Sequence, residues 1–196
     1  MIDALNLRHM VRDAYSAAAS GPTSKHPFPV GRMFAESVGY PSELLDSIPP
    51  AAVEGFAGVS NVSLFADIAP GVTVLDLGCG AGLDALIAAR RTGPAGKVFG
   101  IDFSPAMVER ARSAAAAAGV SNLELSQADV EQLPLSDASI DVALVNGIFN
   151  LNPNRTAIFR ELARVVRPGG SVFCAELILA EPLPEAEQAC SANWFA

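Results

Sequence analysis

Hydrophobic and polar residues follow different periods before and after about residue 70. In residues 2–19 the apolar positions recur near helical spacing, and a stretch rich in Gly and Pro at 21–29 then ends the helix. Further short helices are expected at 31–38, 41–47 and 60–67. This pattern predicts that residues 1–70 form an N-terminal helical cap or lid.

From residue 71 onward, short runs rich in β-branched residues alternate with helical stretches, as in βαβ units. The strands are expected at 72–77, 97–102, 123–126, 140–145 and 171–179. We therefore predict an α/β fold for residues 71–196, with a doubly wound, mostly parallel sheet.

Turn and cap residues agree with these strands. Ser104 and Pro105 supply an N-cap and a first-turn proline, and Gly119 supplies a C-terminal stop, so a helix is expected between them. The pair Asn152-Pro153 opens the next helix in a similar way. Residues 168–170, Pro-Gly-Gly, are expected to turn the chain into its last strand.

Composition and charge narrow the classes of function. With 196 residues, 51% hydrophobic and 17% charged, the chain can bury one sizeable core. Its net charge of -8 argues against a nucleic-acid partner, because phosphate backbones are held chiefly by Lys and Arg. No secretory segment and no apolar run of ~18 residues is found, so we expect a cytoplasmic protein without a membrane partner. Cys79, Cys174 and Cys190 are too widely spaced for a metal site, and reduced thiols are expected.

A glycine-rich turn follows the first strand. Gly78, Gly80 and Gly82 stand at alternate positions, where missing β-carbons let the backbone turn tightly and a ligand lie against it. Asp102 follows at the end of the second strand, where a carboxylate can accept hydrogen bonds from both hydroxyls of a ribose. The two features together predict a nucleoside-containing cofactor.

A dinucleotide is the alternative ligand to consider for this glycine-rich turn. The dinucleotide pattern G-x-G-x-x-G needs its third glycine at position 83, which is Leu83, while Gly82 stands one residue early. Asp76 also suits an ammonium group better than a pyrophosphate, because a carboxylate repels a diphosphate. The spacing therefore argues against a dinucleotide, and Asp76 favours a ligand that carries an ammonium group.

The stretch from about 71 to 180 resembles class I S-adenosylmethionine-dependent methyltransferases. Residues 74–82 match the first motif of that family, 100–104 the second and 127–130 the third. The resemblance implies a Rossmann-like fold, S-adenosylmethionine as cofactor and a small-molecule methyl acceptor, while no catalytic residue or metal ligand is indicated.

The resemblance also assigns roles to individual residues. It implies that Asp102 binds the ribose, that Phe103, Met107 and Val130 lie against the adenine, and that Asp129 accepts from the adenine amino group. Asn146 faces the methionine end. The complete expected cofactor-binding set is Asp76, Gly78, Cys79, Gly80, Gly82, Asp102, Phe103, Met107, Asp129, Val130 and Asn146.

Within that family the chain is similar to the arsenite methyltransferase branch. The similarity lies in the segments 133–135, 150–153, 159–161 and 167–170. Arsenite chemistry needs thiolates to bind a soft trivalent centre. The branch has a cysteine where Gly147 stands and others in the cap, whereas the cap of this chain has none. We therefore expect a relative with a different acceptor.

Several other residues have both a functional and a structural interpretation. His26 and Tyr15 could accept a proton or contact the substrate, or they could be a solvated histidine and a packed tyrosine. Asn61 could reach the methionine carboxylate or cap a helix. The aromatic residues that could line an apolar pocket, or simply belong to the core, are Phe28, Phe34 and Phe149.

The chain departs from the family at its C-terminus. Family members continue past the fifth strand with a helix and an antiparallel pair, whereas this sequence leaves room for one helix at 184–195. An apolar sheet edge recruits other chains, so we expect a truncated form or a homodimer through that edge. Two functions stay open: a methyltransferase for a small molecule, and a catalytically silent module that binds S-adenosylmethionine.

Overall fold

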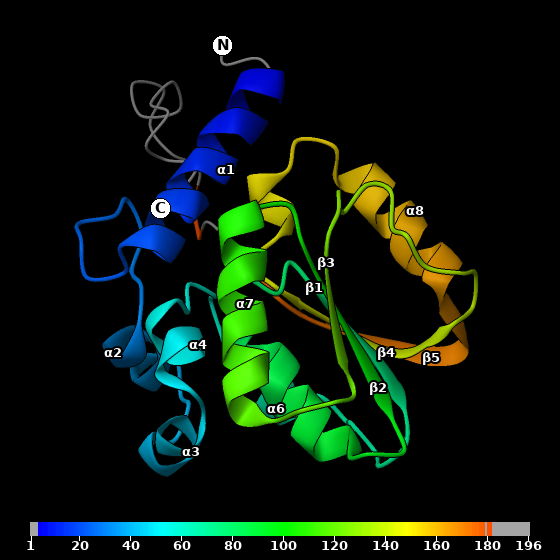
Figure 1. Ribbon diagram of the computed structural model, residues 1–196. Coiled ribbons are helices and arrows are strands. Elements are labelled where there is room, and N and C mark those ends of the chain that lie inside the picture. The colour runs from blue at the N-terminus through cyan, green and yellow to red at the C-terminus, as the bar shows by residue number, and fades with distance from the viewer. Residues whose placement is uncertain (1–3, 179, 182–196) are drawn as a thin grey trace.

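The computed structural model describes residues 4–178 and 180–181. The described part contains a parallel five-stranded sheet in the order β3-β2-β1-β4-β5 (Figure 1). The strands are β1 (Thr73–Leu77), β2 (Lys97–Asp102), β3 (Leu123–Gln127), β4 (Ile140–Asn146) and β5 (Val166–Ala175). The predicted doubly wound α/β fold is confirmed. Its strand order reverses between β1 and β4, which is where open α/β sheets bind their ligands.

Helices cover both faces of the sheet. The helices α6 (Leu83–Thr92) and α7 (Pro105–Ala118) lie on one face, and α8 (Arg155–Val165) lies on the other, after the short helix η1 (Phe149–Leu151). Because both faces are covered, most positions of the central strands β1 and β4 are buried, as is usual for parallel strands.

The signals that predicted α7 act as expected. The Ser104 hydroxyl accepts a hydrogen bond from the Met107 amide at 3.3 Å, which caps the helix at its first turn. At the other end Gly119 adopts the left-handed conformation, with φ of 65°, and stops the helix.

The last strand differs from its prediction. It runs from Val166 to Ala175, whereas the sequence pattern placed it at 171–179. The Pro-Gly-Gly run at 168–170 does not precede the strand but forms an irregularity inside it. There the register jumps from Val166 opposite Ile140 to Ser171 opposite Val142. The expected helix at 184–195 lies outside the described residues.

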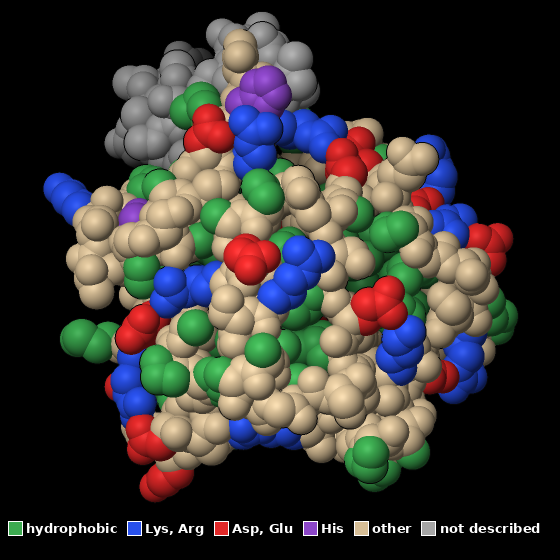
Figure 2. Space-filling model, viewed as in Figure 1, with side chains coloured by type: hydrophobic (Ala, Val, Ile, Leu, Met, Phe, Trp, Pro, Cys, Tyr) green, Lys and Arg blue, Asp and Glu red, His purple; other side chains and the backbone are tan. Residues whose placement is uncertain are grey.

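Two further features concern the charged side chains at the surface and the length of the helices. On the face shown in Figure 2, Lys and Arg side chains lie close to Asp and Glu side chains. Among the helices in the described ranges, none is long and apolar enough to cross a membrane.

The residues before β1 form five helices in the described part of the chain. These are α1 (Ala4–Ser20), α2 (Arg32–Ser37), α3 (Ser42–Ser47), α4 (Pro50–Glu54) and α5 (Val62–Phe65). The sequence pattern missed α4, because its two prolines were interpreted as a break. Pro50 instead occupies the first helical turn, where the missing N–H costs nothing.

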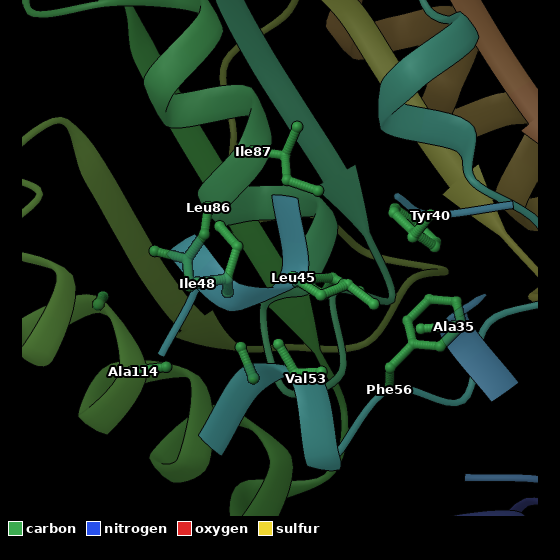
Figure 3. Close-up of a cluster of buried hydrophobic side chains, with 12 residues drawn as sticks. Ala35, Tyr40, Leu45, Ile48, Val53, Phe56, Leu86, Ile87 and Ala114 are labelled. Carbon is green, nitrogen blue, oxygen red and sulfur yellow. The ribbon is translucent and has the colours of Figure 1, made fainter. Parts of the chain in front are cut away.

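The helices α2 to α4 share a core with α6 and α7. Leu45, Ile48 and Val53 from the cap meet Leu86 of α6 and Ala114 of α7 in one buried cluster (Figure 3). Burying such side chains stabilises a fold by roughly 1.5 to 3 kcal/mol each. The cap is therefore held to the sheet layer by ordinary hydrophobic packing, and the predicted division at residue 70 stays a prediction.

Candidate functional site

A pocket of about 940 Å³, its open mouth included, lies at the carboxyl ends of the strands around β1 and β4. The sequence-predicted residues that line it are Asp76, Gly78, Cys79, Gly80, Asp102, Phe103, Met107, Asp129, Val130 and Asn146. Gly82 is not among the lining residues. It forms the N-cap of α6 with φ of 90°, and a β-carbon there would approach Ala111 to 3.1 Å, so its role is to bring α6 close to α7.

The glycine-rich turn is built as its spacing predicted. The amides of Gly78 and Cys79 both donate to the Ile101 carbonyl, at 2.7 and 3.0 Å, which ties the turn to the end of β2. Gly80 has φ of 51° and no atom within 4 Å of the position that a β-carbon would take. The turn therefore leaves open space along its backbone, where a ligand can lie in direct contact with it.

Asp102 lies at the end of β2 beside this turn. Its carboxylate oxygens accept hydrogen bonds from the Gly80 amide at 2.9 Å and the Ser104 amide at 2.8 Å. Burial raises the pKa of Asp102 to about 6, and the hydrogen bonds from the Ser104, Gly80 and Phe103 backbone oppose that rise. A carboxylate has about four lone pairs, so each oxygen can still accept a hydroxyl of a ligand.

Asp76 is the least satisfied polar group of the pocket. Asp76 is 2% exposed, and its Oδ2 atom has no hydrogen-bond partner among the residues that the structure describes. Burial raises its pKa well above the usual range, the negative charges of Asp84 and Asp102 add to this, and a hydrogen bond from the Ala85 backbone opposes it. A buried carboxylate without a partner destabilises a fold, so this atom is suited to a positively charged ligand group.

A buried network joins the cap to the pocket, and the sequence pattern did not reveal it. The Tyr40 hydroxyl donates to Asp84 Oδ1 at 2.5 Å, and the Asn146 side-chain amide donates to Asp84 Oδ2 at 2.9 Å. Asn146 Oδ1 in turn accepts from the amides of Val59 and Ser60, at 2.8 and 3.1 Å. The hydrogen bonds of the Asn146 side chain thus hold the 59–60 segment in place.

The first helix supplies one wall of the pocket. Arg8, Val11 and Tyr15 all line it from α1. Arg8 bonds to Asp129 and, at 3.0 Å, pairs with Glu131. This ion pair connects residues 121 positions apart in sequence, and no local pattern indicated it.

A family model described as a methyltransferase domain matches residues 68–195 of the chain. The chain belongs to this methyltransferase-domain family.

Individual relatives agree with that membership. The chain is 38% identical over 151 residues to an arsenite methyltransferase of Halobacterium salinarum, covering 77% of this chain and 38% of that protein. It is 35% identical over 106 residues to a demethylmenaquinone methyltransferase of Lactococcus lactis, covering 54% of this chain and 42% of that protein.

Solved structures give the same family. CrArsM, an arsenic(III) S-adenosylmethionine methyltransferase from Chlamydomonas reinhardtii, matches with a TM-score of 0.63 and 30% identity, covering 79% of this chain and 52% of that chain. The chain therefore spans about two-fifths to half the length of these relatives. The predicted resemblance to class I S-adenosylmethionine-dependent methyltransferases and to their arsenite branch is confirmed.

Several secondary candidates of the sequence analysis lie away from the pocket. His26 does not line the described pocket, and its Nε2 atom lies 2.8 Å from the Gly21 carbonyl. Asn61 makes no side-chain cap, because its amide donates to the Gly39 carbonyl at 3.0 Å. Of the two interpretations of Phe28, Phe34 and Phe149, the structure agrees with core packing: they are not among the described lining residues, and they pack against Tyr15, Phe56 and Phe159.

The aromatic side chains that do line the pocket are Tyr15, Phe56 and Phe103. Phe56 follows α4, the helix that the sequence pattern missed, and this explains why it was overlooked. Asp84 stands directly after the glycine turn but in the first turn of α6, where an acidic residue is also common for purely electrostatic reasons. The local sequence pattern did not indicate that Tyr40 would be its partner.

Proposed function

We propose that the chain binds S-adenosylmethionine and transfers its methyl group to a small, uncharged organic acceptor. The observation that carries the cofactor assignment is the unpartnered Oδ2 atom of Asp76. An ammonium group is the partner that a buried, unpaired carboxylate requires, and the cofactor carries one on its methionine part.

The remaining residues fit the other parts of the same ligand. We infer that Asp102, which lines the pocket at the end of β2, accepts the ribose hydroxyls through the lone pairs that its two backbone hydrogen bonds leave. Met107 and Val130 offer apolar surface for the adenine, and Asp129 offers an acceptor for its amino group. The bound cofactor supplies an electrophilic methyl group on a sulfonium.

The charged residues that line the pocket indicate which net charge the methyl acceptor carries. Among the described lining residues, Arg8 is the one Lys or Arg, and it is already paired with Asp129 and Glu131. The acidic lining residues are Asp76, Asp84, Asp102 and Asp129. An anionic acceptor would meet repulsion without compensation, so a neutral acceptor is favoured.

Arsenite is a poor candidate for the acceptor. A trivalent arsenic centre is bound by thiolates, and Cys79 is the one cysteine among the described residues of the pocket. Burial raises the pKa of the Cys79 thiol well above its usual range, and Asp76 and Asp102 raise it further. This thiol stays protonated, so it is a weak ligand for arsenic. Gly147 lines the pocket at the place of the expected branch cysteine.

Catalysis in this pocket relies on placement. Burial raises the pKa of Tyr15, and the charges of Asp102 and Glu176 raise it further, so the phenol is a hydrogen-bond donor and not a base. Orienting two reactants contributes roughly 7 to 11 kcal/mol to a rate enhancement. Residues 55–58 line the pocket next to the 59–60 segment, whose backbone amides donate to Asn146 Oδ1.

We propose that the enzyme is located in the cytoplasm and forms a homodimer. We propose no nucleic-acid partner for it. The net charge of -8 disfavours binding to polyanions. A dimer is favoured by the outer edge of β5, which no other strand of the described residues covers, and by Val172 of β5, which is 44% exposed.

The test is a pair of measurements on the same purified protein. Calorimetry with S-adenosylhomocysteine should give binding, and incubation with methyl-labelled S-adenosylmethionine and neutral phenols, quinols and thiols should give a labelled product. Carboxylate acceptors of matched size are the control and should stay unlabelled. Binding without any labelled product across the panel supports the silent module, and the absence of binding overturns the cofactor assignment.

A further inference from the structure

The face of α1 that lines the pocket is defined by its helical spacing. Arg8, Val11 and Tyr15 stand three and four positions apart, so they share one side of the helix. Arg12 follows on another side, is exposed, and pairs with its neighbour Asp13 at 3.1 Å. The helix thus carries two arginines of the same kind, with one directed at the pocket and one at solvent.

Arg8 holds the Asp129 carboxylate in a defined orientation. One guanidinium nitrogen bonds to Asp129 Oδ2, and another lies 3.0 Å from Glu131 Oε1. The second oxygen of Asp129 accepts from the Glu131 amide at 3.0 Å. Asp129 side-chain exposure is 42%, so without Arg8 the backbone contact would be its main restraint.

The orientation of Asp129 matters because it determines where the remaining lone pairs of the carboxylate can accept hydrogen bonds. A carboxylate accepts about four hydrogen bonds, and the Arg8 and Glu131 contacts use two of these positions. The others remain for a donor inside the pocket, which Asp129 lines. An acceptor fixed in place distinguishes an amino group, which donates, from a ring carbonyl, which repels it.

We propose that Arg8 is a specificity-determining residue for the purine base, which acts by fixing the Asp129 carboxylate as an acceptor for an exocyclic amino group. The inference rests on the proposed function, since it needs the adenine of the cofactor to lie at Asp129. Arg8 is a positioning residue, as its own contacts are to Asp129 and Glu131.

The experiment compares two ligands that differ at that group: S-adenosylhomocysteine and S-inosylhomocysteine, in which a carbonyl replaces the amino group. Wild-type protein should prefer the adenosyl ligand by about tenfold or more. Arg8→Met should weaken adenosyl binding by about three- to tenfold and reduce the preference. Arg8→Lys, which keeps the charge, should restore part of it. Arg12→Met is the matched control and should leave both affinities unchanged.

The possible outcomes separate the inference from the proposed function. If Arg8→Met weakens both ligands by the same factor, Arg8 only anchors α1 and the specificity role is overturned. An unchanged preference with unchanged affinities overturns it as well. If wild-type protein binds neither ligand, the proposed function fails, and that result is visible before any variant is made.

Discussion

Among single residues, Asp102 gives cofactor binding a pH dependence. Burial raises its pKa to about 6, and only the ionised form can accept from both ribose hydroxyls. The affinity for S-adenosylhomocysteine should therefore rise by about tenfold between about pH 5 and pH 7. Calorimetry across this range measures it. Asp102→Asn should bind weakly with a flat profile, and a variant with the wild-type slope would assign the titration to another group.

The same residue affects the stability of the unliganded protein with the opposite sign. The pKa of Asp102 is about 6 in the folded protein and about 3.9 in the unfolded chain. The folded state therefore holds more protons between these values, and stability falls as the pH rises through that window. Thermal unfolding at about pH 4.5 and pH 7 should show the fall, and Asp102→Asn should show a smaller one.

Asp76 and Asp84 provide a contrast between a functional and a structural carboxylate. Asp76→Asn replaces a buried carboxyl group whose Oδ2 atom lacks a partner among the described residues, so the unliganded protein should keep or gain stability while ligand affinity falls by at least about tenfold. Asp84→Asn disturbs the hydrogen bonds with Tyr40 and Asn146, so it should lower stability. Thermal unfolding and calorimetry on both variants measure this. A loss of stability in Asp76→Asn would contradict the ligand role.

Between elements, the Tyr40 hydroxyl connects the cap to α6 through Asp84. Its removal in Tyr40→Phe leaves Asp84 Oδ1 with one fewer donor, which should reduce the free energy of unfolding by about 1 to 3 kcal/mol. Urea unfolding measures the loss. The chain has one other tyrosine, Tyr15, and Tyr15→Phe should cost less because that residue is only partly buried. Equal losses would show that the network adds nothing beyond packing.

For the whole molecule, the free edge of β5 predicts a dimer. Light scattering of the protein should give twice the monomer mass, and Val172→Lys should shift it toward the monomer, because charge at an edge opposes strand pairing. Met33→Lys is the matched control, since Met33 is exposed on α2 in the cap. A dilute wild-type monomer contradicts the predicted assembly.

Much of the fold followed from local pattern. The strands from β1 to β4 end within one residue of their expected positions, because a buried parallel strand needs a continuous apolar run. The errors came where local signals have two meanings. Proline at Pro50 begins a helix instead of breaking one, and the Pro-Gly-Gly run at 168–170 lies inside β5, where the partner strand absorbs its irregularity.

The amino-acid sequence by itself determined the glycine turn, Asp102 and the order of strands and helices, because these depend on backbone freedom and on residues close in the chain. Only the tertiary structure decided that Arg8 meets Asp129, that Tyr40 meets Asp84, and that Asp76 keeps an oxygen without a partner. These contacts join residues far apart in sequence. Their energy depends on burial and distance, and neither quantity exists until the chain has folded.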